Sequence, residues 1–121
     1  MCRKLASWRL IALSVLAAST LPAPSFGQEN LLSELYGLGA HAYHSRDYAE
    51  AYANLTAAVE GGSRDPRVYY FRGLALENLG RPEDAQLDFE KGAILEVATG
   101  GDQYPIGKAL ERVQGVARLR L

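Results

Sequence analysis

A repeat of 34 residues constrains the fold of this chain more than any other feature of its sequence. Residues of three kinds recur at this interval: Tyr36, Tyr70 and Tyr104; Gly39, Gly73 and Gly107; and Ala51 and Ala85. Helix lengths alone would not fix such an interval, because loops between helices vary freely in length. Self-similarity at a period of this size is typical of proteins built from stacked copies of one supersecondary unit.

The residues at these positions also match a known signature. The first unit has Leu38-Gly39 followed by Ala51 and Leu55, and the second has Gly73, Ala85 and Phe89. A glycine, a later alanine and a large apolar residue four positions further on resemble the tetratricopeptide repeat (TPR) family. The resemblance implies an all-α fold, a right-handed α-solenoid of antiparallel helix pairs. The units would cover about 32–65 and 66–99, followed by a half unit with a capping helix at about 105–115.

The first 27 residues have the three parts of a secretory signal peptide. Met1 to Lys4 is short and basic, Leu10 to Leu21 is apolar and uncharged, and Ser25-Phe26-Gly27 supplies small residues for a cleavage before Gln28. The apolar run is shorter than the roughly 20 residues that a membrane-spanning helix needs. We therefore expect a signal peptide over 1–27, a domain over 28–121, and a periplasmic or secreted protein that meets the membrane only during export.

The same residues allow two alternatives to a cleaved signal peptide. One is an uncleaved N-terminal membrane anchor. The other is a lipoprotein, which is disfavoured because it needs a cysteine at the cleavage point, and the single cysteine, Cys2, precedes the apolar run. Removal of Cys2 would leave no disulfide in the exported chain, so that its helices must be stabilised by packing.

The charge of the predicted mature chain argues against one class of partner. From Gln28 on, the sequence has 10 basic and 14 acidic residues, a net charge of −4. Binding of nucleic acid depends on basic surfaces that neutralise phosphates. We therefore expect no nucleic-acid partner.

Capping signals divide the first unit into two helices. Asn30 is expected to cap a helix over residues 31–45. Asp47 is expected to cap the next helix, with Glu50 three residues on in an aspartate version of the capping box. Gly61-Gly62 is expected to end that helix.

Similar signals occur in the second unit. Asp65-Pro66 predicts a capped helix start with proline at the first position, and Gly80 predicts the end of that helix. Pro82 opens a fourth helix, which ends at Gly100-Gly101. Its predicted apolar surface consists of Ala85, Leu87, Phe89, Ile94 and Val97.

The recurring small residues predict close packing of the paired helices. Glycine inside a helix costs about 1 kcal/mol relative to alanine, so its recurrence indicates a packing requirement. Gly39 is expected to face Ala51, and Gly73 to face Ala85. The predicted packing positions are Gly39, Ala51, Gly73, Ala85, Phe89 and Gly107.

The resemblance also implies a groove, lined by the first helix of each unit, that binds a peptide or another protein. Transferred to this sequence, the groove positions are Ser33, Tyr36, Ala40, Tyr43 and His44; Arg67, Tyr70, Leu74, Glu77 and Asn78; and Tyr104, Lys108, Glu111 and Arg112. Tyrosines suit such a surface because they combine contact area with a polar hydroxyl, although tyrosine at this position also packs against the neighbouring helix. The carboxylate clamp known in the family is not expected, because Tyr36 and Ala40 occupy positions where it needs lysine and asparagine.

The sequence offers no clear catalytic, cofactor or metal site. His41 and His44 lie three residues apart, but a metal site needs three or four ligands, so we interpret them as surface histidines. Asp47 and Glu50 are better explained by helix capping than by catalysis. Four acidic residues of the fourth helix are interpreted as a solvated face: Glu83, Asp84, Asp88 and Glu90.

These observations favour a non-enzymatic function. The leading hypothesis is an exported bacterial scaffold that binds another protein or peptide. The second is a structural protein that forms homo-oligomers, because two and a half units are close to the minimum for a stable array and the apolar end, Leu119 to Leu121, could be buried against a second copy.

Overall fold

The computed structural model describes residues 26–121, and these residues form helices and turns without a strand. The helices are α1 (Phe26–His44), α2 (Tyr48–Glu60), α3 (Pro66–Asn78), α4 (Pro82–Ala98), α5 (Ile106–Ala109) and α6 (Val116–Leu119). Nearly all of the predicted signal peptide, 1–27, lies outside the described residues. None of the described helices is long and apolar enough to cross a bilayer.

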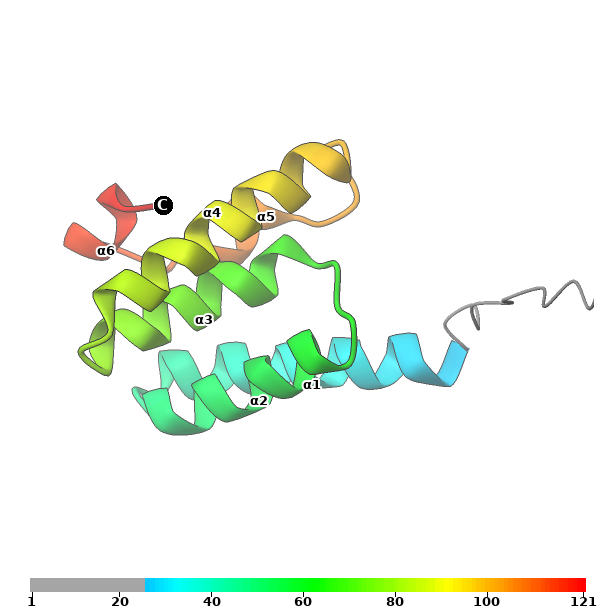
Figure 1. The fold of residues 1–121 in the computed structure, drawn as a ribbon, viewed down its shortest axis with the longest axis horizontal. Helices are drawn as coiled ribbons and strands as arrows, with labels where there is room; N and C mark the ends of the chain where they lie inside the picture. Colours follow the sequence, from blue (N-terminus) through cyan, green and yellow to red (C-terminus); the bar gives the residue numbers. More distant parts are fainter. Residues whose placement is uncertain (1–25) are drawn as a thin grey trace, which may run out of the picture.

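The four long helices form two antiparallel pairs (Figure 1). α1 packs against α2, and α3 packs against α4. The pairs meet because α3 also contacts both α1 and α2. After α4 the chain turns back, and the C-terminal segment with α5 and α6 lies beside the second pair. The prediction of an all-helical fold is therefore confirmed.

The starts of α2 and α3 follow the predicted capping residues. The Asp47 carboxylate accepts a hydrogen bond from the Glu50 backbone N–H at 3.2 Å, and the Asp65 carboxylate accepts one from the Arg67 N–H at 2.9 Å. Pro66 occupies the first turn of α3, where no intrahelical N–H bond is lost. The capping box is only half formed, because the Glu50 side chain accepts from Asn54 and the Asp47 N–H donates to the Ala42 carbonyl.

The prediction that Asn30 caps the first helix was wrong. α1 already begins at Phe26, so Asn30 lies inside its second turn. An N-cap residue marks a helix start only where the preceding residues leave the helical conformation, and no proline or left-handed glycine separates Phe26 from Asn30.

The predicted apolar surface of α4 was wrong in part. Leu87 and Ile94 are each 63% exposed and Val97 is 84% exposed. The buried positions follow the 3.6-residue period instead, and they are Ala85, Asp88, Phe89, Gly92 and Leu95. Leu87 and Ile94 are seven residues apart, so they share the opposite face, which points away from α3.

The capping helix predicted at about 105–115 is not formed at that length. α5 has four residues, and the chain reaches α6 through turns around Gly115, which has a φ of 71°. An isolated helix of this length is marginal in water. Only Leu110 and Val113 of the segment are buried, at 4% and 3% exposure.

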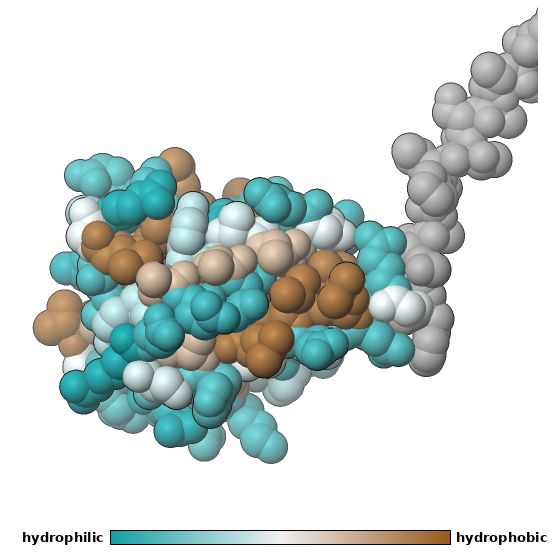
Figure 2. Space-filling model, turned by 90° about the horizontal axis from the view of Figure 1, so that it is seen from below, coloured by the Kyte–Doolittle hydropathy of each residue, from teal (hydrophilic) through white to brown (hydrophobic). Residues whose placement is uncertain are grey.

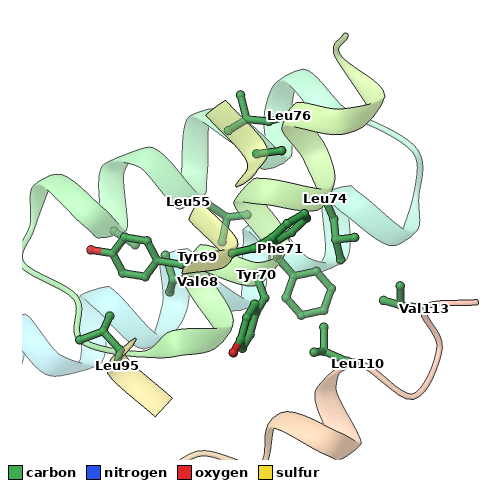
Figure 3. Packing of buried hydrophobic residues seen from close by; sticks show 13 residues of the cluster. Leu55, Val68, Tyr69, Tyr70, Phe71, Leu74, Leu76, Leu95, Leu110 and Val113 are labelled. Carbon is green, nitrogen blue, oxygen red and sulfur yellow. The ribbon is translucent and has the colours of Figure 1, made fainter. Parts of the chain in front are cut away.

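One hydrophobic core joins the two helix pairs (Figure 3). Leu55 of α2 and Val68, Phe71 and Leu74 of α3 are fully enclosed. α3 lies at the centre, because it buries side chains toward α1, α2, α4 and the C-terminal segment. Leu110 and Val113 complete the core from the C-terminal side.

The nearest neighbours of the recurring glycines are larger residues than the predicted alanines. The atoms nearest to a Cβ at Gly39 belong to Leu55, and such a Cβ would come within 2.6 Å of Leu55 Cδ2. Gly73 lies in the same way under Phe89, whose Cδ1 would be 2.7 Å from such a Cβ. Each glycine thus accommodates the large residue four positions after the alanine.

The three remaining predicted packing positions differ in their surroundings. Ala51 forms a small buried cluster with Ala42 of α1 and Ala75 of α3. Ala85 lies next to Gly73, as predicted, and its carbonyl oxygen would be 3.1 Å from a Cβ at Gly73. Gly107 is exposed with no atom within 4 Å of such a Cβ, so the prediction that it has a packing role was wrong.

Candidate functional site

Two of the predicted groove tyrosines lie at the guanidinium of Arg67, and a third groove residue, Ser33, lies close by. The Arg67 Cζ lies 4.2 Å from the centre of the Tyr36 ring and 5.3 Å from the centre of the Tyr104 ring. Ser33 lies one turn before Tyr36 on α1 and lines the same hollow as Arg67 and Tyr104. A cation over an aromatic face is attracted by the ring quadrupole. Arg67 therefore links α1, the start of α3 and the loop before α5.

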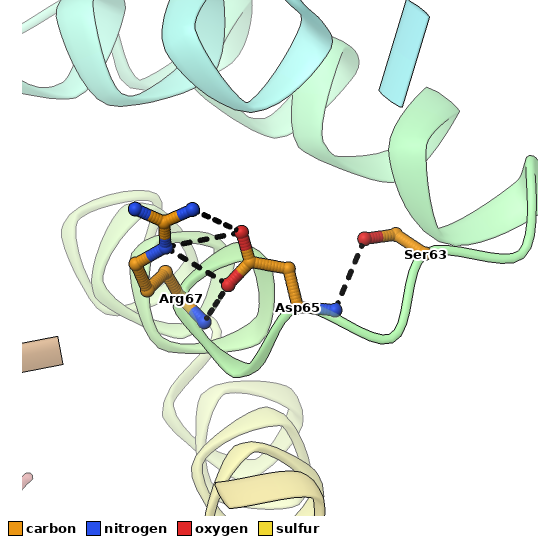
Figure 4. Close-up of polar contacts among 3 residues, drawn as sticks. All are labelled: Ser63, Asp65 and Arg67. Carbon is orange, nitrogen blue, oxygen red and sulfur yellow. Dashed lines mark hydrogen bonds and ion pairs between the residues drawn. The ribbon is translucent and has the colours of Figure 1, made fainter. Parts of the chain in front are cut away.

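Asp65 fixes the orientation of this guanidinium (Figure 4). Its carboxylate accepts from Arg67 Nη2 at 2.7 Å and from Nε at 3.0 Å, while it also caps α3. The Ser63 hydroxyl in turn accepts from the Asp65 backbone N–H at 3.3 Å. Because Asp65 is only 8% exposed, this ion pair is largely shielded from water, and paired donors of this kind hold arginine in one geometry.

The titration properties of the cluster follow from its burial. Burial raises the pKa of the Tyr36 and Tyr104 phenols, although the nearby Arg67 charge opposes the shift. The bonds to Asp65 raise the pKa of Arg67 despite its own partial burial. At neutral pH the site therefore presents two uncharged phenols around a fixed cation.

The surface beside this cluster is hollowed in two adjoining places. One hollow has a volume of about 260 Å³ and includes Ser33, Ser63, Asp65 and Arg67 in its lining. The other has a volume of about 580 Å³ and reaches Gln28, the α2–α3 turn and Thr99. The two hollows share five of their lining residues, which are Glu29, Leu32, Arg64, Gln103 and Tyr104. We call this joint surface the Arg67 hollow.

The remaining tyrosine of the repeat does not belong to this surface. Tyr70 is 5% exposed, its ring lies against Gly92, and its hydroxyl donates to Glu96 Oε2 at 2.6 Å. Burial, followed by the bond to the Glu96 carboxylate, raises the pKa of Tyr70. The prediction that Tyr70 lines a groove together with Tyr36 and Tyr104 was therefore wrong, because Tyr70 joins α3 to the end of α4.

Other predicted groove positions are covered by the chain itself. Leu74 is fully buried, so it does not line a free groove in this structure. Ala40 and Tyr43 pack at the edge of the core, and the Tyr43 and His44 rings both lie edge-on to Phe71, at 5.5 and 5.6 Å. The Asn78 side chain donates to the Leu74 carbonyl within α3.

The C-terminal segment contacts Glu77, another predicted groove position, near the end of α3. Arg120 Nη1 lies 2.6 Å from Glu77 Oε1, and the Glu77 side chain is 14% exposed. Lys108, Glu111 and Arg112 are exposed on the same segment. Their predicted positions in a groove depended on a longer helix than the one that forms, and nothing in the sequence pattern indicated that Arg120 would reach Glu77.

One member of the predicted acidic face has a structural role instead. Asp88 is 5% exposed and accepts two hydrogen bonds of 2.7 Å from the Arg72 guanidinium. This pair joins α3 to α4 and gives the largely buried Arg72 side chain, which is 17% exposed, a partner of opposite charge. Glu83 and Glu90 are exposed as expected, while Asp84 pairs with Arg81 at 2.7 Å.

The outer surface of α1 and α2 is mixed in character. Figure 2 shows this side of the molecule with apolar areas separated by hydrophilic residues. Leu31 and Leu38 of α1 are 54% and 49% exposed. A hollow of about 290 Å³ between the two helices includes Leu38, His41 and Asn54. Single exposed apolar residues are common on protein surfaces, so this face is less distinctive than the Arg67 hollow.

The described residues were also compared with metal-binding arrangements and the chain with known proteins. Within residues 26–121, no three histidine, cysteine, aspartate or glutamate side chains are grouped as metal ligands would be. Comparison with protein-family models, curated proteins and solved structures found no match to this chain.

Proposed function

We propose that this protein is a non-catalytic scaffold of the bacterial cell envelope that binds a peptide or partner protein beside Arg67. In this proposal the helix pairs are tetratricopeptide units of a right-handed α-solenoid, and the chain is exported to the periplasm or secreted after loss of residues 1–27. The observation that carries the proposal is the convergence of Ser33, Arg67 and Tyr104 on one hollow from three separate segments.

The chemistry of this hollow suits a polypeptide ligand. Tyr104 offers an aromatic face, while Ser33 and Gln103 offer hydrogen-bond donors and acceptors on the same surface. The two adjoining hollows have volumes of about 260 and 580 Å³, which reach the range of ligand-binding pockets. Because they are open and continuous at Tyr104, they fit an extended segment better than a small enclosed molecule.

Rigidity supports the same proposal. Arg67 is held on one side by Asp65 and on its faces by Tyr36 and Tyr104. A surface fixed before binding loses little conformational entropy when the partner arrives. The cluster thus provides an ordered binding surface at the junction of the two helix pairs.

A comparison of the wild-type protein with two variants tests the proposal. Tagged wild type, Ser33→Trp and Leu87→Ala would be used to capture proteins from an envelope extract, with quantification by mass spectrometry. Ser33 is exposed at the rim of the hollow, so tryptophan there fills the hollow without changing the core. Leu87 lies on the outer face of α4 and serves as the control.

We expect proteins captured by wild type and Leu87→Ala to be lost with Ser33→Trp. Circular dichroism of the variants checks that they are folded. Recovery of the same proteins by a folded Ser33→Trp variant, or recovery of none by wild type, would contradict the proposal.

Self-association is the second candidate function. It is favoured by the exposed apolar side chains Leu87, Ile94 and Val97 on α4 and by Leu119, which is 87% exposed. Burying such residues against a second copy would remove apolar area from water. Light scattering tests this function, because a monomer at tens of micromolar would exclude it.

A further inference from the structure

We propose that Glu77 binds a basic side chain of the partner, and that Arg120 of the chain's own C-terminus occupies this place in the free protein. The partner segment would carry an arginine or lysine followed by a large apolar residue. This inference rests on the proposed scaffold function and adds a second contact surface, on α3, to the Arg67 hollow.

The two charged side chains of this ion pair differ in their exposure to water. The Glu77 side chain is 14% exposed, whereas Arg120 is 52% exposed, and their nearest atoms are 2.6 Å apart. A carboxylate so far removed from water is destabilised unless a cation pairs with it. Among the described ion pairs, Arg120 is the partner of Glu77. With the C-terminal segment in place, Glu77 therefore depends more on a cation than Arg120 depends on a carboxylate, because Arg120 keeps about half of its side chain in water.

The segment that carries Arg120 is held by few contacts. It follows Gly115, whose φ of 71° turns the chain, and α6 contributes no buried residue. Val116 and Leu119 are 67% and 87% exposed. Besides the Glu77 pair, Arg118 Nη1 donates to the Leu110 carbonyl at 2.9 Å. Segments with little buried apolar surface open at low free-energy cost.

The surroundings of Leu121, the residue after Arg120, indicate that the partner also carries an apolar side chain. Leu121 lines a hollow of about 280 Å³ together with Tyr70, Ile106 and Leu110. Leu110 is buried in the core, so it stays when the last residues leave. A partner with an apolar side chain directly after its basic residue would fill the place of Leu121 while its cation pairs with Glu77.

The chain's own sequence therefore serves as the probe. A labelled peptide with the sequence of residues 116–121 would be titrated with the full chain while its fluorescence anisotropy is measured. The proteins are wild type, Arg120→Ala, Lys91→Ala and the double variant Glu77→Gln/Arg120→Ala. Lys91 is an exposed cation of α4 and controls for the loss of one positive charge.

We expect Arg120→Ala to bind the peptide about threefold to fivefold more tightly than wild type, the factor that corresponds to one partly exposed ion pair. Lys91→Ala should bind as wild type does. Glu77→Gln/Arg120→Ala should lose the gain, and a peptide with both arginines replaced by alanine should not compete. Amide and carboxylate have the same shape, so Glu77→Gln tests the charge rather than the packing.

Three outcomes would overturn the inference: equal binding by Arg120→Ala and wild type, an unchanged gain in the double variant, or a wild-type dimer in light scattering that Arg120→Ala abolishes. The last outcome would mean that the C-terminus of a second copy binds Glu77. The scaffold proposal is tested separately by Ser33→Trp at the Arg67 hollow. A negative result in one experiment therefore does not change the interpretation of the other.

Discussion

The side chain of Leu55 lies directly over Gly39, so that α1 and α2 meet where a glycine replaces a side chain. The same relationship joins Gly73 to Phe89 one repeat later. In both units the glycine leaves space for a large residue of the second helix, and that residue belongs to the main core.

Replacement of Gly39 by alanine should therefore destabilise the protein. The added Cβ would lie 2.6 Å from Leu55 Cδ2, and we expect an overpacking cost of about 1 to 3 kcal/mol. Gly37→Ala is the matched control on the same helix, because no atom lies within 4 Å of a Cβ there. It should stabilise the protein by up to about 1 kcal/mol through helix propensity. Urea unfolding of both variants measures the difference, and equal midpoints would contradict it.

The Arg72–Asp88 pair should contribute to stability only as a pair. Its side chains are 17% and 8% exposed, so Asp88→Ala leaves a cation with little access to water. We expect a loss of roughly 2 to 4 kcal/mol in the free energy of unfolding, slightly below the range for fully buried pairs. Arg72→Met/Asp88→Leu should recover most of this loss, because no charge then remains unpaired. Denaturant titration of the two variants would decide, and a double variant as unstable as Asp88→Ala would count against this account.

The N-cap of α2 distinguishes two acidic residues that the sequence pattern treats as one motif. Asp47 accepts from the Glu50 N–H, whereas the Glu50 side chain bonds to Asn54. Asp47→Ala should cost about 1 kcal/mol, the usual contribution of an N-cap. Glu50→Gln should change stability by less than about 0.5 kcal/mol. Thermal melts of the two variants provide the test. A larger loss of stability in Glu50→Gln than in Asp47→Ala would indicate that the complete capping box forms.

His44 should titrate below its ordinary pKa of 6.5. Burial lowers the pKa of His44, and the Arg112 charge and His41 add to the shift. Because the folded-state pKa is depressed, protonation favours the unfolded chain. The stability contribution of neutral His44 is therefore present above pH 6.5 and is lost as the pH falls from 6.5 through the folded-state pKa. NMR titration of the His44 ring should give a midpoint below 6.5, and Arg112→Ala should raise this midpoint while Lys91→Ala should not.

Much of the fold could be predicted from local signals. Asp47, Asp65-Pro66 and Gly80 marked the ends of α2 and α3 because caps, proline and left-handed glycine act within a few residues. The start of α1 and the length of α5 could not be found in this way. They depend on whether neighbouring segments continue a helix or cover it, and a single local pattern does not determine this.

The candidate site was predictable in part. The repeat indicated Ser33, Tyr36, Arg67 and Tyr104, since equivalent positions in stacked units lie on one side. The Asp65–Arg67 bond had a local signal in the two-residue spacing, but this signal was interpreted as capping alone. Tyr70 is buried against Gly92 and Glu96 of α4, and Leu74 lies in the same core as Leu110 and Val113 of the C-terminal segment. Both depend on tertiary contacts that a local pattern does not determine.

The alanine cluster of Ala42, Ala51 and Ala75 lies where α1, α2 and α3 meet. Small side chains at such a junction allow the three helices to pack closely. We expect Ala75→Val, which adds two carbons to this buried cluster, to push α3 away from α1. Arg67 on α3 would then shift relative to Tyr36 on α1. We therefore expect the geometry of the Arg67 hollow to respond to substitutions at residues that lie outside it.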